Sequence, residues 1–386
     1  MIELLDGRVS LHIGDCINVL EAMGHNSVDC VVTSPPYWGL RDYGVEGQIG
    51  LEPTLAEHLS VMVRVFEAVK RVLKPTGTCW VNYGDCYATT PNGRSAADTK
   101  ATGNDDRTFR DKPFSTIQGV LKAKDLCMVP NRFAIALQEA GWWVRSENVW
   151  GKPNPMPESI RDRPATAHEK VFMFTKSSRY FYDAEAVRQN MAASSVSRLA
   201  QDVESQTGST RANGGRKTNG NMKAVGGKSS ATPRNDGARW NENNGRGFKP
   251  RGHKREQEGL TSKWDDMSKA EQQANGRNLR NYEPAPLDVW HIATRPFSEA
   301  HFATFPPELA ERCILAGCPK GGLVLDPFGG AGTTALVALR HGRKASLIEL
   351  NPEYAEITQR RIEKEWRIQP KSKSNNHGPL FAEDAA

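Results

Sequence analysis

The 386-residue chain has few of the features that define several common protein classes. No apolar run approaches the ~18 residues of a membrane-spanning helix, and no signal peptide opens the chain, so we expect a cytoplasmic protein. The seven cysteines show neither a C-x-x-C pair nor the spacing of zinc ligands. We therefore expect them to be small buried residues of a reducing compartment, and we expect no metal site.

Apolar residues are also scarce, at 38% of the chain, which is low for a packed enzyme. The length exceeds one average domain, so one large α/β domain with insertions and two domains both fit. The composition favours a compact core joined to long polar segments. The net charge of +6 and the sequence pI of about 8.9 favour a polyanionic partner.

Short apolar runs alternate with helical apolar spacings through residues 1–186. Residues 28–33 predict a buried strand, and residues 54–73 predict a helix that Lys74-Pro75 ends. Further strands are expected at 11–13, 78–83, 142–150 and 170–174, and further helices at 16–23 and 130–140. Residues 88–125 are polar and contain glycines, which predicts a mobile insertion.

A second polar stretch, residues 187–286, is rich in Gly, Asn, Ser and Arg. Residues 201–260 contain 12 Lys and Arg against 6 Asp and Glu, an excess equal to that of the whole chain, 51 − 45 = 6. This composition is typical of a solvated, disordered insertion. It also suits a segment that becomes ordered on contact with DNA phosphates and bases, and the two interpretations are compatible.

Regular patterns return at residue 287 and continue to residue 368. A proline opens the helix expected at 306–315, and the buried strand expected at 323–325 leads into a glycine-rich loop. A helix ending near residue 340, a strand at 344–348 and a helix at 352–366 follow. The polar residues 369–386 predict a disordered tail.

The stretch Thr33-Ser34-Pro35-Pro36-Tyr37-Trp38 directly follows the strand expected at 28–33. Its two prolines make a rigid, extended turn and remove two backbone donors. The Ser34 hydroxyl and the adjacent backbone carbonyl are left beside an aromatic pair, where they suit the exocyclic amino group of a planar base. Taken alone, the stretch is equally typical of a strand-to-loop transition marked by proline.

The glycine-rich loop is Asp326-Pro327-Phe328-Gly329-Gly330-Ala331-Gly332-Thr333, and the acidic residue Glu349 ends the next strand. Strand, glycine loop, helix, strand and acidic residue together form a nucleotide-binding βαβ unit. The 17 residues from Gly332 to Glu349 are close to the expected spacing. The loop is neither the G-x-G-x-x-G of pyrophosphate cofactors nor the G-x-x-x-x-G-K-[ST] of triphosphates, and a glycine turn after a strand is common by itself.

Together, S-P-P-Y and D-P-F-x-G-x-G-T resemble the S-adenosylmethionine-dependent DNA amino-methyltransferases, which modify N6 of adenine or N4 of cytosine. The order, catalytic motif first and cofactor loop last, resembles the permuted beta class. The resemblance covers most of residues 8–185 and 287–366. It implies an α/β fold with a mostly parallel seven-stranded methyltransferase sheet, one antiparallel strand, helices on both faces and a polar target-recognition insertion at 187–286.

The resemblance also implies roles for individual residues. Residues 1–186 would form the catalytic half of the methyltransferase domain, and residues 287–368 the cofactor-binding half. Ser34, Pro35, Pro36 and Tyr37 match the catalytic motif, and Tyr37 would stack on a base flipped out of the duplex. The implied S-adenosylmethionine site comprises Asp15 beside the adenine, Glu349 on the ribose, Phe302 in the pocket-closing segment 301–306, and the loop residues Asp326, Pro327, Phe328, Gly330, Gly332 and Thr333, of which Phe328, Gly330 and Gly332 would contact the methionine portion.

The serine in place of the aspartate of D-P-P-Y bears on which base is modified. In the family, S-P-P-Y accompanies N4-cytosine specificity more often than D-P-P-Y does, so N4-methylcytosine is favoured over N6-methyladenine. A hydroxyl both accepts and donates, and it therefore tolerates the N3 acceptor of cytosine, whereas a carboxylate only accepts. Methylation at C5 of cytosine would need a cysteine nucleophile after a proline, and none of the seven cysteines follows one.

Other substrates and classes stay open. RNA bases and a protein glutamine amide are alternatives, because related P-P-Y motifs serve them, but the long basic insertion favours double-stranded DNA. A catalytically silent DNA-binding module of the same fold is an alternative from another class, against which the intact residues of both sites argue. Trp38 is either a further stacking residue or a buried loop anchor. A homodimer and a cognate restriction nuclease are further candidate partners.

Overall fold

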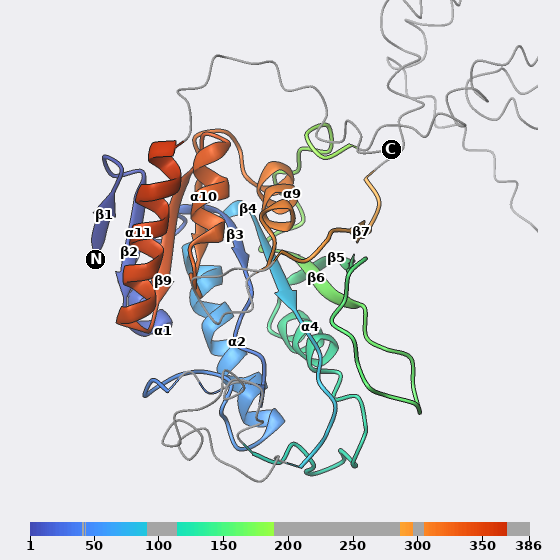
Figure 1. The fold of residues 1–386 in the computed structure, drawn as a ribbon. Helices are drawn as coiled ribbons and strands as arrows, with labels where there is room; N and C mark the ends of the chain where they lie inside the picture. The colour runs from blue at the N-terminus through green and yellow to red at the C-terminus, as the bar shows by residue number, and fades with distance from the viewer. Residues whose placement is uncertain (41, 43, 91–113, 189–285, 296–304, 369–386) are drawn as a thin grey trace, which may run out of the picture. The chain divides into compact units, whose positions relative to one another are not determined.

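The computed structural model describes residues 1–40, 42, 44–90, 114–188, 286–295 and 305–368 (Figure 1). The chain divides into two compact units, and all of these residues except Arg188 belong to the first, which comprises residues 1–187 and 286–382. Much of the insertion expected at 88–125, nearly all of that expected at 187–286, and the tail lie outside the described residues. The expected domain boundaries therefore stay predictions.

Within the described residues, nine strands form one sheet in the order β1-β2-β9-β8-β3-β4-β6-β5-β7 (Figure 1). The strands are β1 (Ile2–Leu4), β2 (Val9–Ile13), β3 (Val28–Thr33), β4 (Leu73–Tyr83), β5 (Trp143–Gly151), β6 (His168–Thr175), β7 (Val289–His291), β8 (Leu323–Asp326) and β9 (Lys344–Glu349). The central strands are nearly continuous apolar runs, as in β3, because both of their faces are covered.

The expected seven-stranded sheet is corrected to nine strands. The two additional strands, β1 and β7, have three residues each and lie at the two edges, and they are too short to give a periodic signal. Two strands, β1 and β6, run antiparallel to the others, where the resemblance implied one. The seven strands between the edges contain the single expected antiparallel member, β6.

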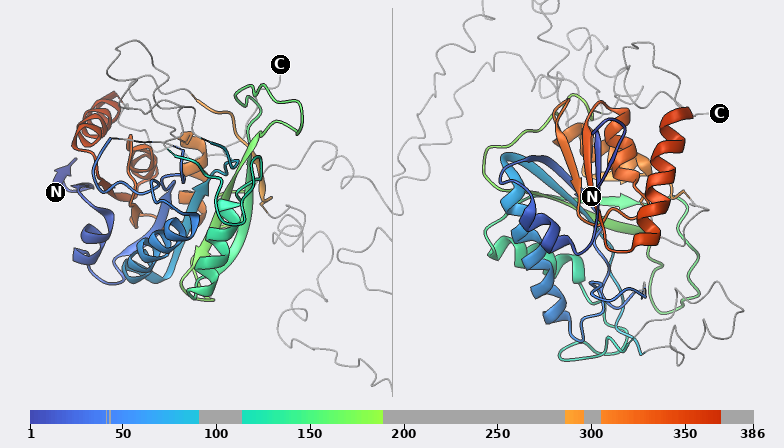
Figure 2. Two further views of the ribbon diagram at one scale, coloured as in Figure 1. Left: turned by 90° about the horizontal axis from the view of Figure 1, so that it is seen from below. Right: turned by 90° about the vertical axis from the view of Figure 1, so that its left-hand side faces the viewer.

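Helices cover both faces of the sheet, as expected (Figure 2). The helices of the described residues are α1 (Cys16–Ala22), α2 (Leu55–Val72), α4 (Val129–Glu139), α9 (Pro307–Gly317), α10 (Thr333–Arg340) and α11 (Pro352–Ile368). One buried apolar cluster joins α1, α2 and α4 to the sheet around Phe66, and a second joins α9, α10 and α11 around Leu336. The sheet therefore lies between two cores.

Strands from opposite ends of the chain meet at the centre of the sheet. β3 and β8 pair in parallel, with Cys30 opposite Val324. Their carboxyl ends therefore reach the same edge, where open α/β sheets bind ligands. β4, which begins directly after α2, runs parallel to β3 and ends at this edge with Asn82 and Tyr83. The permuted order of the motifs thus leaves them side by side in space.

Among the described residues, no helix is long and apolar enough to cross a membrane. In the same part of the chain, no group of three or more His, Cys, Asp or Glu side chains could hold a metal ion. All seven cysteines are free; six are buried and Cys86 is half-buried. The interpretation of the cysteines as small buried residues is therefore confirmed for six of them.

Candidate active site

A cavity at the carboxyl ends of β3, β8 and β9 is lined by both motifs. The expected site residues that line it are Asp15, Ser34, Pro35, Pro36, Tyr37, Asp326, Pro327, Phe328, Gly330, Thr333 and Glu349. Gly332 is not among the lining residues, and Phe302 lies outside the described residues, although its neighbour Phe305 lines the cavity. Segments nearly 300 residues apart in the sequence thus share one site.

Asp326 connects the two motifs beneath the cavity. Its side chain accepts hydrogen bonds from the hydroxyls of Thr33 (2.6 Å) and Thr334 (2.7 Å) and from the Phe328 N–H (3.1 Å). Burial raises the pKa of Asp326 to about 7, although these three donors oppose the shift. Because Thr33 directly precedes the S-P-P-Y turn and Thr334 lies in the first turn of α10, one carboxyl group holds both motifs in place.

The two glycines expected at the cofactor face different surroundings. Gly330 has φ +47°, and a Cβ added there would meet only the Phe328 carbonyl oxygen, at 3.9 Å. Gly332 has φ +75°, and an added Cβ would lie 2.8 Å from Cγ2 of Thr358 in α11. Gly330 therefore leaves the cavity open to a ligand, whereas Gly332 allows α10 to begin close against α11.

Two further carboxylates line the cavity at the ends of β2 and β9. Glu349, the last residue of β9, accepts from the N–H groups of Gly330 (2.9 Å) and Asn351 (2.9 Å), and burial raises its pKa. Asp15 is the N-cap of α1. The Gly14 N–H donates to the Glu349 carbonyl oxygen (2.9 Å), so the two carboxylates come from adjacent strand ends.

The lining suits a cationic nucleoside that carries no phosphate. Three carboxylates line the cavity, and none of the described lining residues is a lysine or arginine. A pyrophosphate or triphosphate would therefore lack a cationic side chain, whereas a ribose can donate to Glu349 and a cationic group is attracted by the carboxylates. S-adenosylmethionine, a nucleoside with a sulfonium and an ammonium group, fits this set of side chains.

Two strands hold the hydroxyl of Tyr37 next to the catalytic turn. This hydroxyl donates to Oε2 of Glu169 in β6 (2.9 Å) and accepts from Nδ2 of Asn82 in β4 (2.9 Å). The Ser34 hydroxyl makes a longer contact with it, at 3.4 Å. Lys152 forms an ion pair with the other oxygen of Glu169. Burial raises the pKa of Tyr37 well above its usual range, so the phenol stays protonated.

Sequence reasoning missed Asn82, Glu169 and Lys152. None of them belongs to a motif, and a polar residue near the end of a strand is common. The one signal was the position of Asn82 at the end of an expected strand, because carboxyl ends of strands surround the ligand in this fold. Glu169 is brought to the site by the antiparallel pairing of β6 with β4, which the sequence did not predict in detail.

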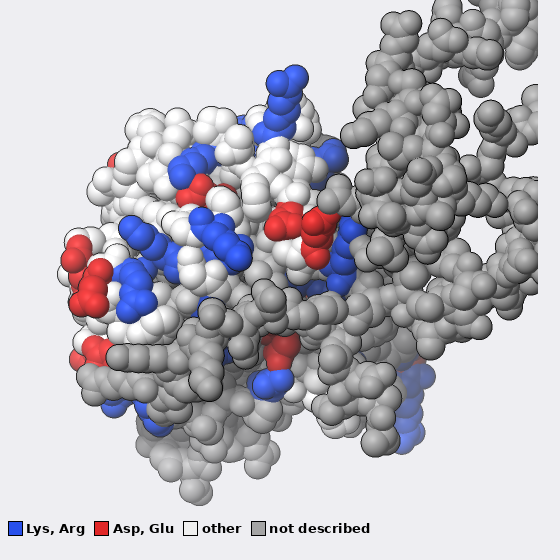
Figure 3. All heavy atoms as spheres, turned by 90° about the horizontal axis from the view of Figure 1, so that it is seen from above, with Lys and Arg blue, Asp and Glu red and all other residues white. Residues whose placement is uncertain are grey.

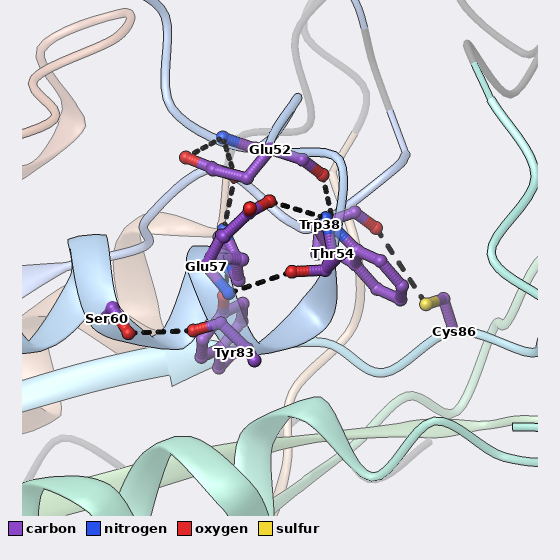
Figure 4. A network of polar contacts seen from close by, with 10 residues as sticks. Trp38, Glu52, Thr54, Glu57, Ser60, Tyr83 and Cys86 are labelled. Atoms are coloured by element: carbon purple, nitrogen blue, oxygen red, sulfur yellow. Dashed lines mark hydrogen bonds and ion pairs between the residues drawn. The ribbon is translucent and has the colours of Figure 1, made fainter. Parts of the chain in front are cut away.

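The segment that follows the catalytic turn lines one wall of the cavity through Leu40, Val45, Gly47, Gln48 and Ile49. Trp38 begins this segment; it is 1% exposed, and its indole N–H donates to the Glu52 carbonyl oxygen (3.0 Å) (Figure 4). Glu52 also accepts from the Gly50 N–H through its carboxylate (3.0 Å). Of the two roles considered for Trp38, the structure therefore supports the buried loop anchor.

A buried histidine continues this network under the catalytic turn. One ring nitrogen of His58 lies 2.7 Å from the Glu52 carboxylate, and the other lies 2.5 Å from the Tyr83 hydroxyl. The ring of Tyr83 in turn packs on that of Tyr37, with ring centres 5.4 Å apart. Tyr37 is thus held by its hydroxyl and by one side of its ring.

These features define the class of the protein. The protein has a largely parallel sheet between two layers of helices. The proline turn and the glycine loop meet at one cavity, whose described lining contains three carboxylates and no lysine or arginine. This combination is that of an S-adenosylmethionine-dependent methyltransferase. A family model of N6/N4 methyltransferases, described as DNA methylase, matches residues 28–360. The chain belongs to this family of DNA amino-methyltransferases, and the resemblance drawn from the two motifs is confirmed.

The most similar relatives include type II methyltransferases that match along nearly the whole chain. Identity is 38% over 354 residues with M.XycI of Xanthomonas campestris pv. cyanopsidis (92% of this chain, 87% of that one) and 38% over 356 residues with M.Cfr9I of Citrobacter freundii (92% and 88%). It is 35% over 350 residues with M.SmaI of Serratia marcescens (91% and 89%). Relatives of this type belong to restriction-modification systems.

Among solved structures, the chain is similar to PvuII DNA methyltransferase (cytosine-N4-specific). The TM-score is 0.52 at 19% sequence identity, and the match covers 95% of this chain and 88% of that one. This likeness shows the shared methyltransferase fold.

Proposed function

We propose that the protein methylates N4 of cytosine within a specific sequence of double-stranded DNA. The observation that carries this proposal is the position of Ser34, a neutral hydroxyl, in the same cavity as the glycine loop. The amino group of cytosine lies beside the N3 acceptor, and a hydroxyl can donate to that acceptor or accept from the amino group. A carboxylate at this position would face the N3 lone pair.

Positioning and electrostatics would supply the catalysis. An aromatic amino group is a weak nucleophile because its lone pair is delocalised into the ring. Acceptors at the Ser34 hydroxyl and the Pro35 carbonyl favour a pyramidal nitrogen whose lone pair points at the methyl group. Bound S-adenosylmethionine supplies that methyl group already activated on a sulfonium. Reaching the nitrogen requires the base to leave the duplex, and Tyr37, which is half-buried and lines the cavity, offers a stacking face.

Apart from Gly332, which does not line the cavity, the cofactor residues keep the roles expected for them as part of the proposal. Glu349 would accept from the ribose and Asp15 would lie beside the adenine, at adjacent strand ends. Phe328 and Gly330 would contact the methionine portion. Asp326, Pro327 and Thr333 would shape the loop, Gly332 would act through the packing of α10, and the role of Phe302 stays a prediction.

The base assignment is tested by incubating mixed DNA with the protein and S-adenosylmethionine, then identifying the modified nucleoside by mass spectrometry. We expect N4-methylcytosine. N6-methyladenine without N4-methylcytosine would show that the assignment is wrong and would favour the second candidate, an N6-adenine methyltransferase.

The role of Ser34 is tested by Ser34→Ala. We expect turnover to fall about 10²-fold or more, as when one preorganised hydrogen-bonding group is removed. Cofactor affinity should be nearly unchanged. Ser60→Ala is a matched control, because Ser60 is exposed and its hydroxyl donates to the Ala56 carbonyl oxygen within α2 (2.9 Å), away from the cavity (Figure 4). Wild-type turnover of Ser34→Ala would contradict the role proposed for the hydroxyl.

A catalytically silent DNA-binding module is the candidate from another class. Such a module would neither bind nor consume labelled S-adenosylmethionine, so a binding titration separates it from an enzyme. The three carboxylates that line the cavity suit the cationic cofactor and therefore favour the enzyme.

We further propose that residues 187–286, nearly all of which lie outside the described residues, recognise the DNA target. On the described surface seen from above in Figure 1, Lys and Arg side chains are interspersed with Asp and Glu, so this face does not concentrate positive charge (Figure 3). Deleting residues 201–260 should spare cofactor binding but remove sequence-selective methylation. Selective methylation by the deletion protein would place recognition elsewhere. A partner nuclease, suggested by the type II relatives, is a proposal of the same kind, as are the homodimer and the cytoplasmic location expected from the sequence.

A further inference from the structure

Methyl transfer to an amino group leaves the product nitrogen with one proton too many. In the proposed function the Ser34 hydroxyl contacts that nitrogen, but a hydroxyl is too weak a base to keep the proton. The carboxylates that line the cavity are Asp15, Asp326 and Glu349. In the described part of the chain, no hydrogen bond joins any of them to Ser34 or Tyr37, and their contacts are with Thr hydroxyls and backbone N–H groups.

A line of hydrogen bonds leads from Ser34 to a different carboxylate. The Ser34 hydroxyl lies 3.4 Å from the Tyr37 hydroxyl, which donates to Oε2 of Glu169 at 2.9 Å. The first of these contacts is long, as catalytic hydrogen bonds often are before the substrate is bound. Glu169 itself does not line the cavity. Within the described structure, the Tyr37 hydroxyl connects it to Ser34.

The surroundings of Glu169 suit an ionised proton acceptor. Nδ2 of Asn82 donates to Oε2 of Glu169 (2.6 Å) and to the Tyr37 hydroxyl (2.9 Å), while Oδ1 of Asn82 is buried and has no partner within the described structure. Turning the amide round would place an acceptor against the carboxylate, so the amide is locked in this orientation. Lys152 pairs with Oε1 of Glu169 and lies 4.5 Å from the ring centre of Trp150. The side chain of Glu169 is 18% exposed, so a proton can pass from it to water.

We infer that Glu169 accepts the proton released by the reaction, through the hydroxyls of Ser34 and Tyr37. The N–CH₃ bond forms as the S–CH₃ bond breaks. The methylated nitrogen then loses one proton to Oγ of Ser34, the hydroxyl proton of Ser34 moves to the Tyr37 oxygen, and the hydroxyl proton of Tyr37 moves to Oε2 of Glu169. The base leaves neutral, both hydroxyls are restored, and Glu169 returns the proton to water.

The inference rests on the proposed amino-group methylation, and its first test uses two nearly isosteric variants of the full-length protein. Tyr37→Phe keeps the ring but removes the relaying hydroxyl, and Glu169→Gln keeps the shape but removes the accepting charge. Each should lower the single-turnover rate of DNA methylation about 10²-fold, the scale of general-base catalysis. Dissociation constants for S-adenosylmethionine and DNA, measured separately by titration, should stay within about twofold because neither group binds a ligand directly.

A chemical rescue distinguishes a proton acceptor from a side chain that only positions Tyr37. Glu169→Ala leaves space for a small carboxylate, so formate should restore part of its single-turnover rate, while chloride at the same ionic strength should not. Tyr37→Phe should gain nothing from formate, because its relay is broken before Glu169. Slow Glu169 variants that formate fails to rescue would overturn the inference in favour of positioning.

Glu147→Gln is the matched control. Glu147 lies in the neighbouring strand β5 and forms an ion pair with Lys170 of β6 (2.5 Å). It does not line the cavity, so its loss should leave the rate unchanged. Wild-type rates in both Tyr37→Phe and Glu169→Gln would show that water takes the proton directly, and the inference would be wrong although the proposed function held. A wild-type protein that forms no N-methylated base would instead refute the proposed function.

Discussion

Two carboxyl groups flank the catalytic turn, and they differ in nearly every respect. Asp326 lies behind Thr33, is 2% exposed, accepts three hydrogen bonds from uncharged donors and has its pKa raised to about 7 by burial. Glu169 lies behind Tyr37, has an 18% exposed side chain and is paired with a lysine. Asp326 connects β3, β8 and α10. Glu169 accepts from the Tyr37 hydroxyl, pairs with Lys152 and is partly accessible to solvent.

The difference indicates that one carboxyl group of the site stabilises the fold and the other takes part in proton transfer. A buried carboxyl group whose hydrogen bonds are all used inside the fold can hold backbone segments in register but cannot exchange protons readily. A carboxylate with a cationic partner and access to water can exchange them. We therefore assign the spacing of the two motifs to Asp326 and the proton chemistry to Glu169, and the following predictions test that division.

The largest expected effect on folding is that of Asp326→Ala. Removing the carboxyl group leaves the buried hydroxyls of Thr33 and Thr334 without their acceptor, which should lower the free energy of unfolding by about 3 kcal/mol. Glu169→Ala should cost less, about 1–2 kcal/mol, because Lys152 keeps partial access to water although Asn82 is buried. Urea denaturation of both variants measures this contrast. Equal losses of stability would contradict the division of roles.

Sequence and structure agree where the controlling interactions are local. Apolar periodicity predicted the helices and all but the two shortest strands, because each of those elements buries a continuous face or run. The S-P-P-Y turn and the glycine loop were predictable because proline and glycine act on their own backbone. The network of Glu169, Asn82 and Lys152 was not, because it arises from the pairing of β4 with β6 and leaves no local pattern in the sequence.

The glycine loop offers the next largest effect. Gly332→Ala should lower the free energy of unfolding by about 2–3 kcal/mol, because the new Cβ would clash with Thr358 and φ is positive. Gly330→Ala has the same unfavourable sign of φ but no clash, so it should cost only about 1 kcal/mol. Because Gly330 lines the cavity, Gly330→Ala should also weaken the binding of S-adenosylmethionine, although it destabilises the fold less than Gly332→Ala does. Thermal denaturation measures the loss of stability of the two variants, and titration with S-adenosylmethionine measures their loss of cofactor affinity. Equal stability of both variants would mean that Gly332 does not act through helix packing.

Glu349 provides a third carboxyl group for comparison, one that we assign to the cofactor. Glu349→Ala should weaken S-adenosylmethionine binding by about 1.5–3 kcal/mol, the range for hydrogen bonds to charged groups. Calorimetric titration measures this loss, with Glu169→Ala as the control whose cofactor affinity should not change. Unchanged affinity in Glu349→Ala would remove Glu349 from the cofactor site.

The last expected effect concerns pH and isolates the buried state of Asp326. Its pKa is about 7 in the folded protein against an ordinary value of 3.8, so between these values the folded state retains a proton that the unfolded state has lost. The stability that this group contributes is therefore fully present below pH 3.8 and is lost as the pH rises to about 7. Asp326→Asn removes this titration.

The stability of the wild type relative to Asp326→Asn should thus fall by about 2–3 kcal/mol between pH 5 and pH 8, at about 1.4 kcal/mol for each pH unit below the folded pKa. Urea denaturation of both proteins at both pH values measures the difference. Glu349 and Asp85, whose pKa values burial also raises, titrate in both proteins and largely cancel. If the two proteins lose stability in parallel, Asp326 is ionised throughout this range and does not hold the buried proton assigned to it.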